Sequence, residues 1–430
     1  MPRNSRCERK RLRRWCRVDA RVDRRPRDWS RARHAGSRAR HAWPLQAAAI
    51  CVFSISAATI AQERGPTAVS PQDLRTAIDH LGDIDYASRS KAARVVRRAP
   101  TQQAVAALLQ TVQEHRDSYV RYKSLVLLTG FNDPRAADQM AEVLSAPNDR
   151  LREVAYGFFE RYPDKSLTPR LLAALEKETG EFVRPALVRA LAASGDDANV
   201  RDVLLLDITR GADFFRSTVI EAVGDYRRAY ALPKLTEVAK LEGPLQDDAV
   251  LALGKIGDKR SLEVLASLQR SGSRALQPTV AAAICLLGVN CGSHLGYLHQ
   301  VLTFAEDNPG YQDLVRAAAI GLDAVATKGN EEALGMLFAT GIASEDPLRA
   351  PLALSVAKVA LRNPPMMLKT LQDLPAQKQA IDLLAEGFDM LQEDLEEEQF
   401  FVTVRREYWS APDKSPVRRL AEQLIGKLDF

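Results

Sequence analysis

The sequence predicts an all-α protein, an α-solenoid in which helical hairpins stack into a superhelix. The first observation is a register in which an apolar residue and an arginine recur as Val120-Arg121, Leu151-Arg152, Val183-Arg184 and Phe215-Arg216. The intervals between these arginines are 31, 32 and 32 residues, and Arg89 precedes Arg121 by 32 residues. Repeats of about 20 to 50 residues are typical of stacked units that bury a continuous core against their neighbours.

The second observation is that each repeat has apolar residues at helical spacing on both sides of a turn. In the unit that starts at Val183, Leu187 and Leu191 precede the turn and Val200 and Val203 follow it. Each unit is therefore predicted to be helix, turn, helix. An aspartate recurs in the turn, where a carboxylate accepts hydrogen bonds from the free N–H groups of the next helix. These aspartates are Asp133, Asp164, Asp196 and Asp258.

The amino end differs from the repeats. Residues 1–42 form an arginine-rich leader with 16 Lys and Arg against four acidic residues, and residues 43–61 carry no charge. A positive region, an apolar region and small residues before Gln62 predict a secretory signal. The positive region is long for such a signal, which indicates a start codon assigned too far upstream.

The alternative for residues 43–61 is a membrane anchor that is never cut. Nineteen uncharged residues approach the ~20 needed to cross a bilayer, and the arginines would hold the amino end in the cytoplasm. Both interpretations predict an exported protein in the periplasm or cell envelope, either free or anchored to the inner membrane. Residues 62–83 are predicted to be a linker and a capping helix, because Ser70 suits the N-cap and Pro71 the first helical position.

Residues 84–360 are predicted to form about eight stacked hairpins. Asn132-Asp133-Pro134-Arg135-Ala136 and the stretch 248–260 resemble the short bacterial form of the HEAT repeat. The resemblance implies that the repeat arginine pairs with the turn aspartate of an adjacent unit, as a structural ladder along the stack. That ladder would join Arg121, Arg152, Arg184 and Arg216 to aspartates such as Asp133, Asp164, Asp196 and Asp258. Gln246 and Gln277 stand at the arginine position and would interrupt it.

Residues 361–430 depart from the period, contain several prolines and end in an amphipathic stretch from Val417 to Leu428. They are predicted to be a carboxy-terminal helical cap. The acidic run from Glu393 to Glu398 is typical of a solvated helix face, with binding of cations or of a basic partner as the alternative.

The charge balance argues against a nucleic-acid partner. Removing the leader's 16 basic and four acidic residues from the totals of 60 and 55 leaves 44 and 51, a net charge of −7 for residues 62–430. A nucleic-acid-binding solenoid would need a basic face on its folded part.

Two cysteines lie close together in the repeats. Cys285 shares a register position with Gly254 and Ala192, where small residues would let the two helices of a unit approach, and Cys291 follows in the turn. In an exported protein these would be the remaining cysteines, which favours a disulfide. Free thiols stay open as an alternative, and so does a metal site with His294 and His299, although the ligand spacing is unlike that of zinc sites.

No catalytic motif is present: there is no Gly-x-Ser-x-Gly, no Walker loop, no Cys-x-x-Cys and no His-Glu pair. The sequence therefore predicts no catalytic residue, no resident metal and no cofactor. In HEAT arrays the second helices line the concave side, and the resemblance implies a mixed-charge groove there, which suits a protein or peptide partner. The predicted binding positions are Asp138, Glu142, Arg170, Arg201, Asp202, Lys234, Glu237 and Glu263.

Two functions follow from these patterns. The first is an exported, non-enzymatic scaffold that binds a protein or peptide partner on its concave face. The second is an enzyme or enzyme accessory of the HEAT-like kind, either lyase-type or glycosylase-like. The export signal and the acidic repeat region favour the scaffold, since both enzyme examples act on intracellular substrates.

Overall fold

Twenty-two α-helices and four short 3-10 helices, with no strand, make up the part of the chain that the structure describes. This computed structural model describes residues 67–430 apart from residues 196, 309 and 392–393. The predicted all-α fold is confirmed. The predicted leader and the signal or anchor segment lie outside the described residues.

The amino-terminal half begins with two helices and a short turn of 3-10 helix, followed by regular hairpins. Its elements are α1 (Pro71–Asp79), η1 (His80–Gly82), α2 (Tyr86–Arg98), α3 (Thr101–Glu114), α4 (Ser118–Thr129), α5 (Arg135–Val143), α6 (Asp149–Arg161), η2 (Lys165–Leu167), α7 (Thr168–Leu175), α8 (Val183–Ala193), α9 (Ala198–Asp207), α10 (Asp213–Asp225), η3 (Ala229–Ala231) and α11 (Leu232–Ala239).

The carboxy-terminal half continues the hairpins with longer helices. Its elements are α12 (Gln246–Ile256), η4 (Lys259–Ser261), α13 (Leu262–Ser271), α14 (Gln277–Leu286), α15 (Cys291–Asp307), α16 (Gln312–Thr327), α17 (Glu331–Ala343), α18 (Arg349–Arg362), α19 (Pro364–Asp373), α20 (Gln377–Met390), α21 (Asp394–Ser410) and α22 (Pro416–Leu428).

Eight hairpins, from α2–α3 to α16–α17, occupy the predicted repeat segment. Their turns are fixed locally, because Asp133, Asp164 and Asp258 each accept the backbone N–H two residues further on, at 3.0, 2.8 and 2.9 Å. In the fourth of these hairpins Asp197 caps α9, while Asp196 lies outside the described residues. The hairpin pattern runs past residue 360, since α18 packs against α19.

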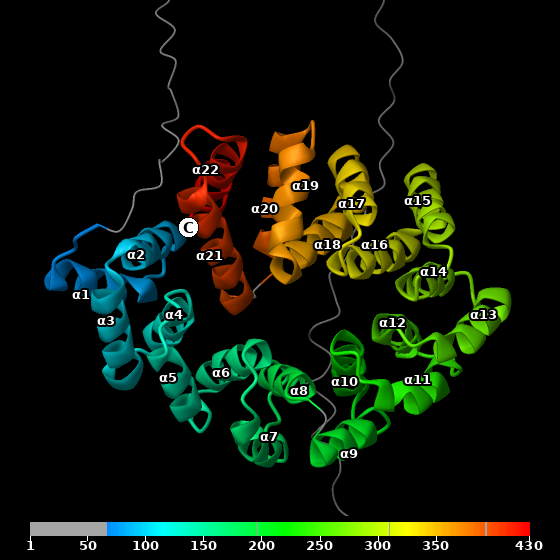
Figure 1. Cartoon of the computed structure of the whole chain (residues 1–430), viewed down its shortest axis with the longest axis horizontal. Helices are drawn as coiled ribbons and strands as arrows, with labels where there is room; N and C mark the ends of the chain where they lie inside the picture. The colour runs from blue at the N-terminus through cyan, green and yellow to red at the C-terminus, as the bar shows by residue number, and fades with distance from the viewer. Residues whose placement is uncertain (1–66, 196, 309, 392–393) are drawn as a thin grey trace, which may run out of the picture. The chain divides into compact units, whose positions relative to one another are not determined.

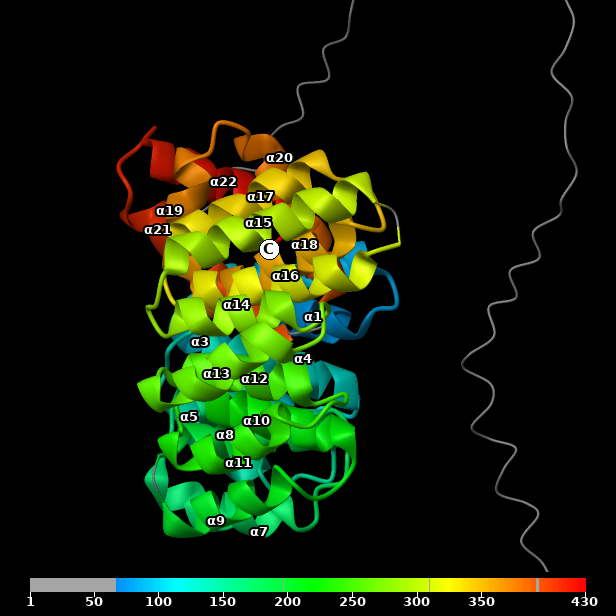
Figure 2. The ribbon, with the colours of Figure 1, turned by 90° about the vertical axis from the view of Figure 1, so that its right-hand side faces the viewer.

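The helices form two layers. The first helices of the repeats, α4 to α18 in even numbers, lie on the inner side of the array and the second helices lie outside (Figure 1). Figure 2 shows the units stacked along the array. Inner helices pack directly on one another, as α10 does on α12 and α12 on α14.

Small residues allow this close packing of the inner layer. A Cβ added to Gly224 would lie 2.8 Å from the Cα of Ala252, and one added to Gly254 would lie 2.5 Å from the Cα of Ala283. The small residue therefore brings neighbouring units together. The expectation that this position lets the two helices of one unit approach is wrong for Gly254, which faces Ala283 of the next unit.

The two ends of the described array meet. Helix α21 packs against α4 and α6 (Figure 1). Its Glu398 also contacts Arg97 of α2. The Glu398 carboxylate, 2% exposed, accepts hydrogen bonds from Nε and Nη2 of Arg97 at 2.9 and 2.6 Å. Asp394 accepts from the Tyr122 hydroxyl and from Nζ of Lys123, both at 2.6 Å. We call these contacts of α21 with α2, α4 and α6 the closing interface.

Candidate functional site: a carboxy-terminal cleft and a central charge cluster

The repeat arginines bind the end of the preceding helix, so the predicted pairing with turn aspartates is wrong. Arg121 donates to the Val112 carbonyl at 2.7 Å and Arg184 to the Leu175 carbonyl at 2.7 Å. Free carbonyls and the negative end of the helix dipole make a helix carboxyl end a favourable place for a cation. The turn aspartates are held instead by their own turns.

Carboxylates at or just after the end of the second helix of the same hairpin bind two of these arginines. Arg152 pairs with Glu178 at 2.8 Å and Arg184 with Asp207 at 3.1 Å, while Arg216 pairs with Asp213 on its own helix at 2.9 Å. The side-chain hydrogen bonds of Arg152 raise its pKa, with Glu178 as the leading cause. These contacts link each arginine to the end of the helix before it.

The two glutamines at the arginine position make the same carbonyl contact. Nε2 of Gln246 donates to the Ala239 carbonyl at 3.0 Å, and Nε2 of Gln277 donates to the Leu268 and Gly272 carbonyls at 3.1 Å. Gln246 and Gln277 therefore keep the contact with the helix-end carbonyls that the arginines make elsewhere. Only the positive charge of the arginine is missing at these two positions.

The eight predicted binding positions lie on the outer layer of helices, so their predicted placement on the concave side is wrong (Figure 1). The first helices of these units, not the second, face inward. The positions are Asp138 and Glu142 on α5, Arg170 on α7, Arg201 and Asp202 on α9, Lys234 and Glu237 on α11, and Glu263 on α13. Several pair locally, such as Lys234 with Glu237 at 3.0 Å.

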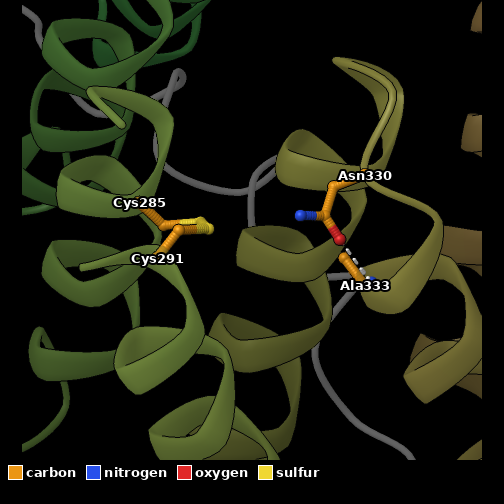
Figure 3. The surroundings of a disulfide bond; sticks show 4 residues. All are labelled: Cys285, Cys291, Asn330 and Ala333. Carbon is orange, nitrogen blue, oxygen red and sulfur yellow. Dashed lines mark hydrogen bonds between the residues drawn. A yellow bond between two sulfur atoms is a disulfide. The ribbon is translucent and has the colours of Figure 1, made fainter. Parts of the chain in front are cut away.

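The structure joins Cys285 and Cys291 in a disulfide, with the two Cα atoms 4.1 Å apart (Figure 3). The bridge ties the end of α14 to the start of α15. Nearby, the Asn330 side chain caps α17 by accepting the backbone N–H of Ala333 at 2.8 Å (Figure 3). Both features fix helix ends.

The acidic run is part of an interface, so the expectation of a solvated helix face is wrong. Glu398 is buried against Arg97, and Asp394 lies between Lys123 and Tyr122. Burial alone would raise the pKa of Asp394, but Lys123, Tyr122 and Arg150 together lower it. Burial and the neighbouring Asp394 raise the pKa of Tyr122.

A cleft of about 740 Å³ lies where α17, α18, α20, α21 and α22 meet, with Tyr86 of α2 at its edge. Five carboxylates line it against two cations, and we call it the carboxy-terminal cleft. The acidic residues are Asp382, Glu386, Asp389, Glu397 and Asp429, and the basic ones are Arg349 and Lys427. Its apolar lining is Ile342, Ala385, Phe388, Phe401 and Leu428.

Both cations of the cleft are already paired. Arg349 binds Glu386 at 2.6 Å and Lys427 binds Asp382 at 2.6 Å. Arg94 also pairs with Asp429, and the hydrogen bonds from Lys427 and Lys378 lower the pKa of Asp382. Phe388 and Phe401 also line the cleft, with ring centroids 6.3 Å apart. The cleft thus combines carboxylates with apolar side chains.

A second set of charged side chains meets on the inner helices. The Asp225 carboxylate, 12% exposed, receives Arg189 at 3.0 Å, Lys255 at 2.8 Å and Arg362 at 2.7 Å. Arg189 also pairs with Glu160 at 2.8 Å, and the Tyr226 hydroxyl donates to Glu160 at 2.5 Å. The Arg362–Asp225 pair joins α18 to α10, which are 137 residues apart in sequence at these positions.

The pKa values in this region are strongly shifted. Burial alone would raise the pKa of Asp225, but Lys255, Arg362 and Arg189 together hold it well below its usual range. Burial raises the pKa of the Asp323 carboxyl on α16 to about 6, although Lys358, Lys255 and Arg362 act in the other direction. We call Glu160, Arg189, Asp225, Lys255, Asp323, Lys358 and Arg362 the central charge cluster.

Sequence reasoning did not single out the central charge cluster, although a signal for it exists. Asp225, Lys255 and Lys358 each lie ten residues after the apolar residue that starts their repeat, namely Phe215, Leu245 and Leu348. Aligning the repeats at that position shows charged residues on the first helices. The resemblance implies that the second helices face inward, so it points to the charged residues of the second helices instead.

Among residues 67–430, outside the gaps named above, no group of three or more His, Cys, Asp or Glu side chains is placed to hold a metal ion. His294 and His299 therefore do not join the two cysteines in a ligand set within the described structure. The same residues include no helix that is both long enough and apolar enough to cross a membrane.

Residues 74–158 match the protein family described as HEAT repeats. This match confirms the resemblance over the first repeats. No curated protein matches the chain in sequence.

Several solved structures are similar to the chain. The E. coli protein YibA is 19% identical with a TM-score of 0.37, covering 50% of this chain and 82% of its own. Kap121p is 14% identical with a TM-score of 0.30, and the match covers 83% of this chain and 40% of Kap121p. In the complex of CpcE and CpcF of phycocyanin lyase from Nostoc sp. PCC7120, one chain is 17% identical with a TM-score of 0.24, covering 76% of this chain and 97% of that one.

Proposed function

From the premise that residues 74–158 are HEAT repeats, we propose that the protein is a non-enzymatic scaffold that binds a protein partner through the carboxy-terminal cleft. The segment bound there is a peptide stretch with basic side chains next to an apolar one. The observation that carries the proposal is the lining of the cleft, five carboxylates and two paired cations beside apolar side chains.

Charge and shape both support this choice. The carboxylates complement Lys or Arg of a partner, and electrostatic complementarity speeds encounter and selects the partner. Ile342, Phe401 and Leu428 line the cleft next to them, and burying apolar surface favours association. Arg349 and Lys427 are held by Glu386 and Asp382. They therefore do not compete with the partner's basic side chains for the remaining carboxylates.

The proposal includes export of the protein to the cell envelope, on the strength of residues 1–61. Mass spectrometry of protein from its native envelope tests it, with an amino terminus at or near Gln62 as the expected result. Peptides from residues 20–40 in a periplasmic fraction would contradict cleavage, and their recovery with the membrane would favour the anchor.

A charge-reversal pair tests the binding site. In Asp389→Lys with Glu397→Lys, two cleft carboxylates become cations, and we expect partner affinity to fall about tenfold or more with a weaker dependence on salt. Affinity is measured by surface plasmon resonance against partners captured with the unaltered protein.

The matched control reverses two exposed carboxylates of the outer layer, Asp138→Lys with Glu263→Lys. The proposal expects no loss of affinity in this control. If the control loses binding and the cleft variant keeps it, the outer layer is the binding surface and the cleft is not.

A further inference from the structure

The chain's own residues 427–430 form one side of the carboxy-terminal cleft, and we call them the tail segment. Lys427, Leu428 and Asp429 belong to the lining of the cleft, and Phe430 follows them. Helix α22 ends at Leu428, and Asp429 takes the left-handed conformation with a φ of 58°. A residue in this conformation ends a helix and redirects the chain. The tail segment therefore leaves the helical path inside the cleft.

Two contacts join the tail segment to residues that line the cleft. Nζ of Lys427 lies 2.6 Å from the Asp382 carboxylate, which also pairs with Lys378 of its own helix at 2.9 Å. Three positions after Lys427, the Phe430 ring stacks on the Phe401 ring, with centroids 4.0 Å apart and planes at 12°. The tail segment thus presents a cation to a carboxylate of the cleft and an aromatic ring to an aromatic ring of the cleft.

The tail segment is separate from the buried face that holds α22 in place. That face consists of Leu420, Ala421, Leu424 and Ile425, all of which precede the tail segment. The ion pairs of the tail segment, with Asp382 and with Arg94 of α2, are partly exposed, and exposed ion pairs stabilise little. Burial of the Phe430 ring, 2% exposed, is therefore the main contribution that keeps the segment in the cleft. The segment can leave the cleft while the rest of α22 stays packed.

We propose that the cleft recognises a partner segment in which a Lys or Arg precedes an aromatic residue by three positions, and that this partner replaces the tail segment. The inference rests on the proposed function of the cleft and adds the chemistry of the partner. The partner's cation takes the place of Lys427 at Asp382, and its ring takes the place of Phe430 on Phe401. Occupation by the tail segment lowers the apparent affinity for the partner, because only molecules with a vacated cleft can bind it.

A peptide copy of the tail segment tests this recognition before the partner is known. The probe is fluorescein-labelled Gly-Lys-Leu-Asp-Phe, the sequence of residues 426–430, and fluorescence anisotropy measures its binding to the full chain. In Lys427→Ala with Phe430→Ala, the protein's own segment loses both contacts with the cleft. We expect this variant to bind the peptide about tenfold more tightly than the unaltered protein does, because an attached competitor has been removed.

Three controls show whether the peptide binds through the two proposed contacts. Adding Phe401→Ala to the double variant should lower the affinity about tenfold, since the stacking ring is lost. The peptide Gly-Asp-Leu-Lys-Phe has the same composition and should bind several-fold more weakly, because its cation is adjacent to the ring. Trp409→Ala with Lys414→Ala removes an exposed aromatic residue and an exposed cation elsewhere in the carboxy-terminal cap, and this variant should bind the peptide as the unaltered protein does.

A second variant keeps the test valid if the alanine at position 430 destabilises the fold. Circular dichroism establishes whether each variant has the helix content of the unaltered protein. Lys427→Ala with Phe430→Leu fills the buried space at position 430 but cannot stack on Phe401. It should bind the peptide several-fold more tightly than the unaltered protein does, a gain of binding that loss of structure would not produce.

The inference fails if neither folded variant binds the peptide more tightly than the unaltered protein does, or if Phe401→Ala leaves peptide binding unchanged. Captured partners should bind the variant without the two tail contacts several-fold more tightly than the unaltered protein. Equal partner affinity would overturn the inference and leave the cleft as the partner site. Unchanged partner affinity in Asp389→Lys with Glu397→Lys would instead overturn the proposed function, so the two failures are distinguishable.

Discussion

At the scale of single residues, Arg184 shows how a repeat position stabilises the array. Its guanidinium donates to the Leu175 and Glu178 carbonyls at 2.7 and 3.0 Å and pairs with the buried Asp207 at 3.1 Å. The carbonyl contact needs only a donor of the right length, as Gln246 shows with Ala239. The carboxylate contact needs the charge.

These two contacts predict a graded response at position 184. Arg184→Ala should lower the free energy of unfolding by about 1–3 kcal/mol, because Asp207 and two carbonyls lose a donor. Arg184→Gln should lose less, since the amide can still reach the helix end. Urea denaturation checks the order; equal losses for the two variants would show that the carbonyl contact contributes nothing.

At the scale of helices, the packing of α12 on α14 depends on one missing side chain. A Cβ at Gly254 would lie 2.5 Å from Cα and 2.8 Å from the carbonyl oxygen of Ala283, and backbone atoms cannot move aside as a side chain can. We therefore expect Gly254→Ala to lower the free energy of unfolding by about 1–3 kcal/mol, as overpacking does in tightly packed cores. Thermal and urea denaturation measure the change.

Gly292→Ala on α15 is the matched control. A Cβ there would meet nothing within 4 Å, and alanine favours the helix by about 1 kcal/mol over glycine. The control should be neutral or slightly stabilising. If both variants behave alike, the close approach of α12 to α14 is not limited by Gly254.

The sequence predicted the elements better than their orientation. The register that begins at Val120 predicted the hairpins because buried apolar positions recur at helical spacing. It could not show which helix faces inward, since Lys234 of the outer layer and Lys255 of the inner layer are equally acceptable as solvated side chains. The sequence also could not predict that the two ends of the array meet, because Arg97 and Glu398 are 301 residues apart and Glu398 lies outside the repeats.

At the scale of the whole described array, closure rests on a few charged contacts. Asp394→Lys with Glu398→Lys would place two cations opposite Lys123 and Arg97. Breaking a buried ion pair in this way is strongly destabilising, by about 3–5 kcal/mol. We expect α21 to leave α2, α4 and α6, and small-angle X-ray scattering should show a larger radius of gyration.

Restoring complementarity provides the control. With Arg97→Glu and Lys123→Glu added to the two reversals, the signs match again, and the radius of gyration should return toward that of the unaltered protein. An unchanged radius in the first variant would mean that apolar contacts such as Leu395 with the helix at Gly157 hold the ends together without the charges.

The contact between Arg97 and Glu398 also sets an order of events during synthesis. Every hairpin can form as soon as its own two helices have left the ribosome, because its contacts are local. The closing interface must wait until residue 398 has emerged, which is 301 residues after Arg97. During that interval the Arg97 guanidinium and the surfaces of α4 and α6 remain uncovered. The growing chain is therefore an open array that displays a charged surface to the cell, and it hides that surface only when its last helices are complete.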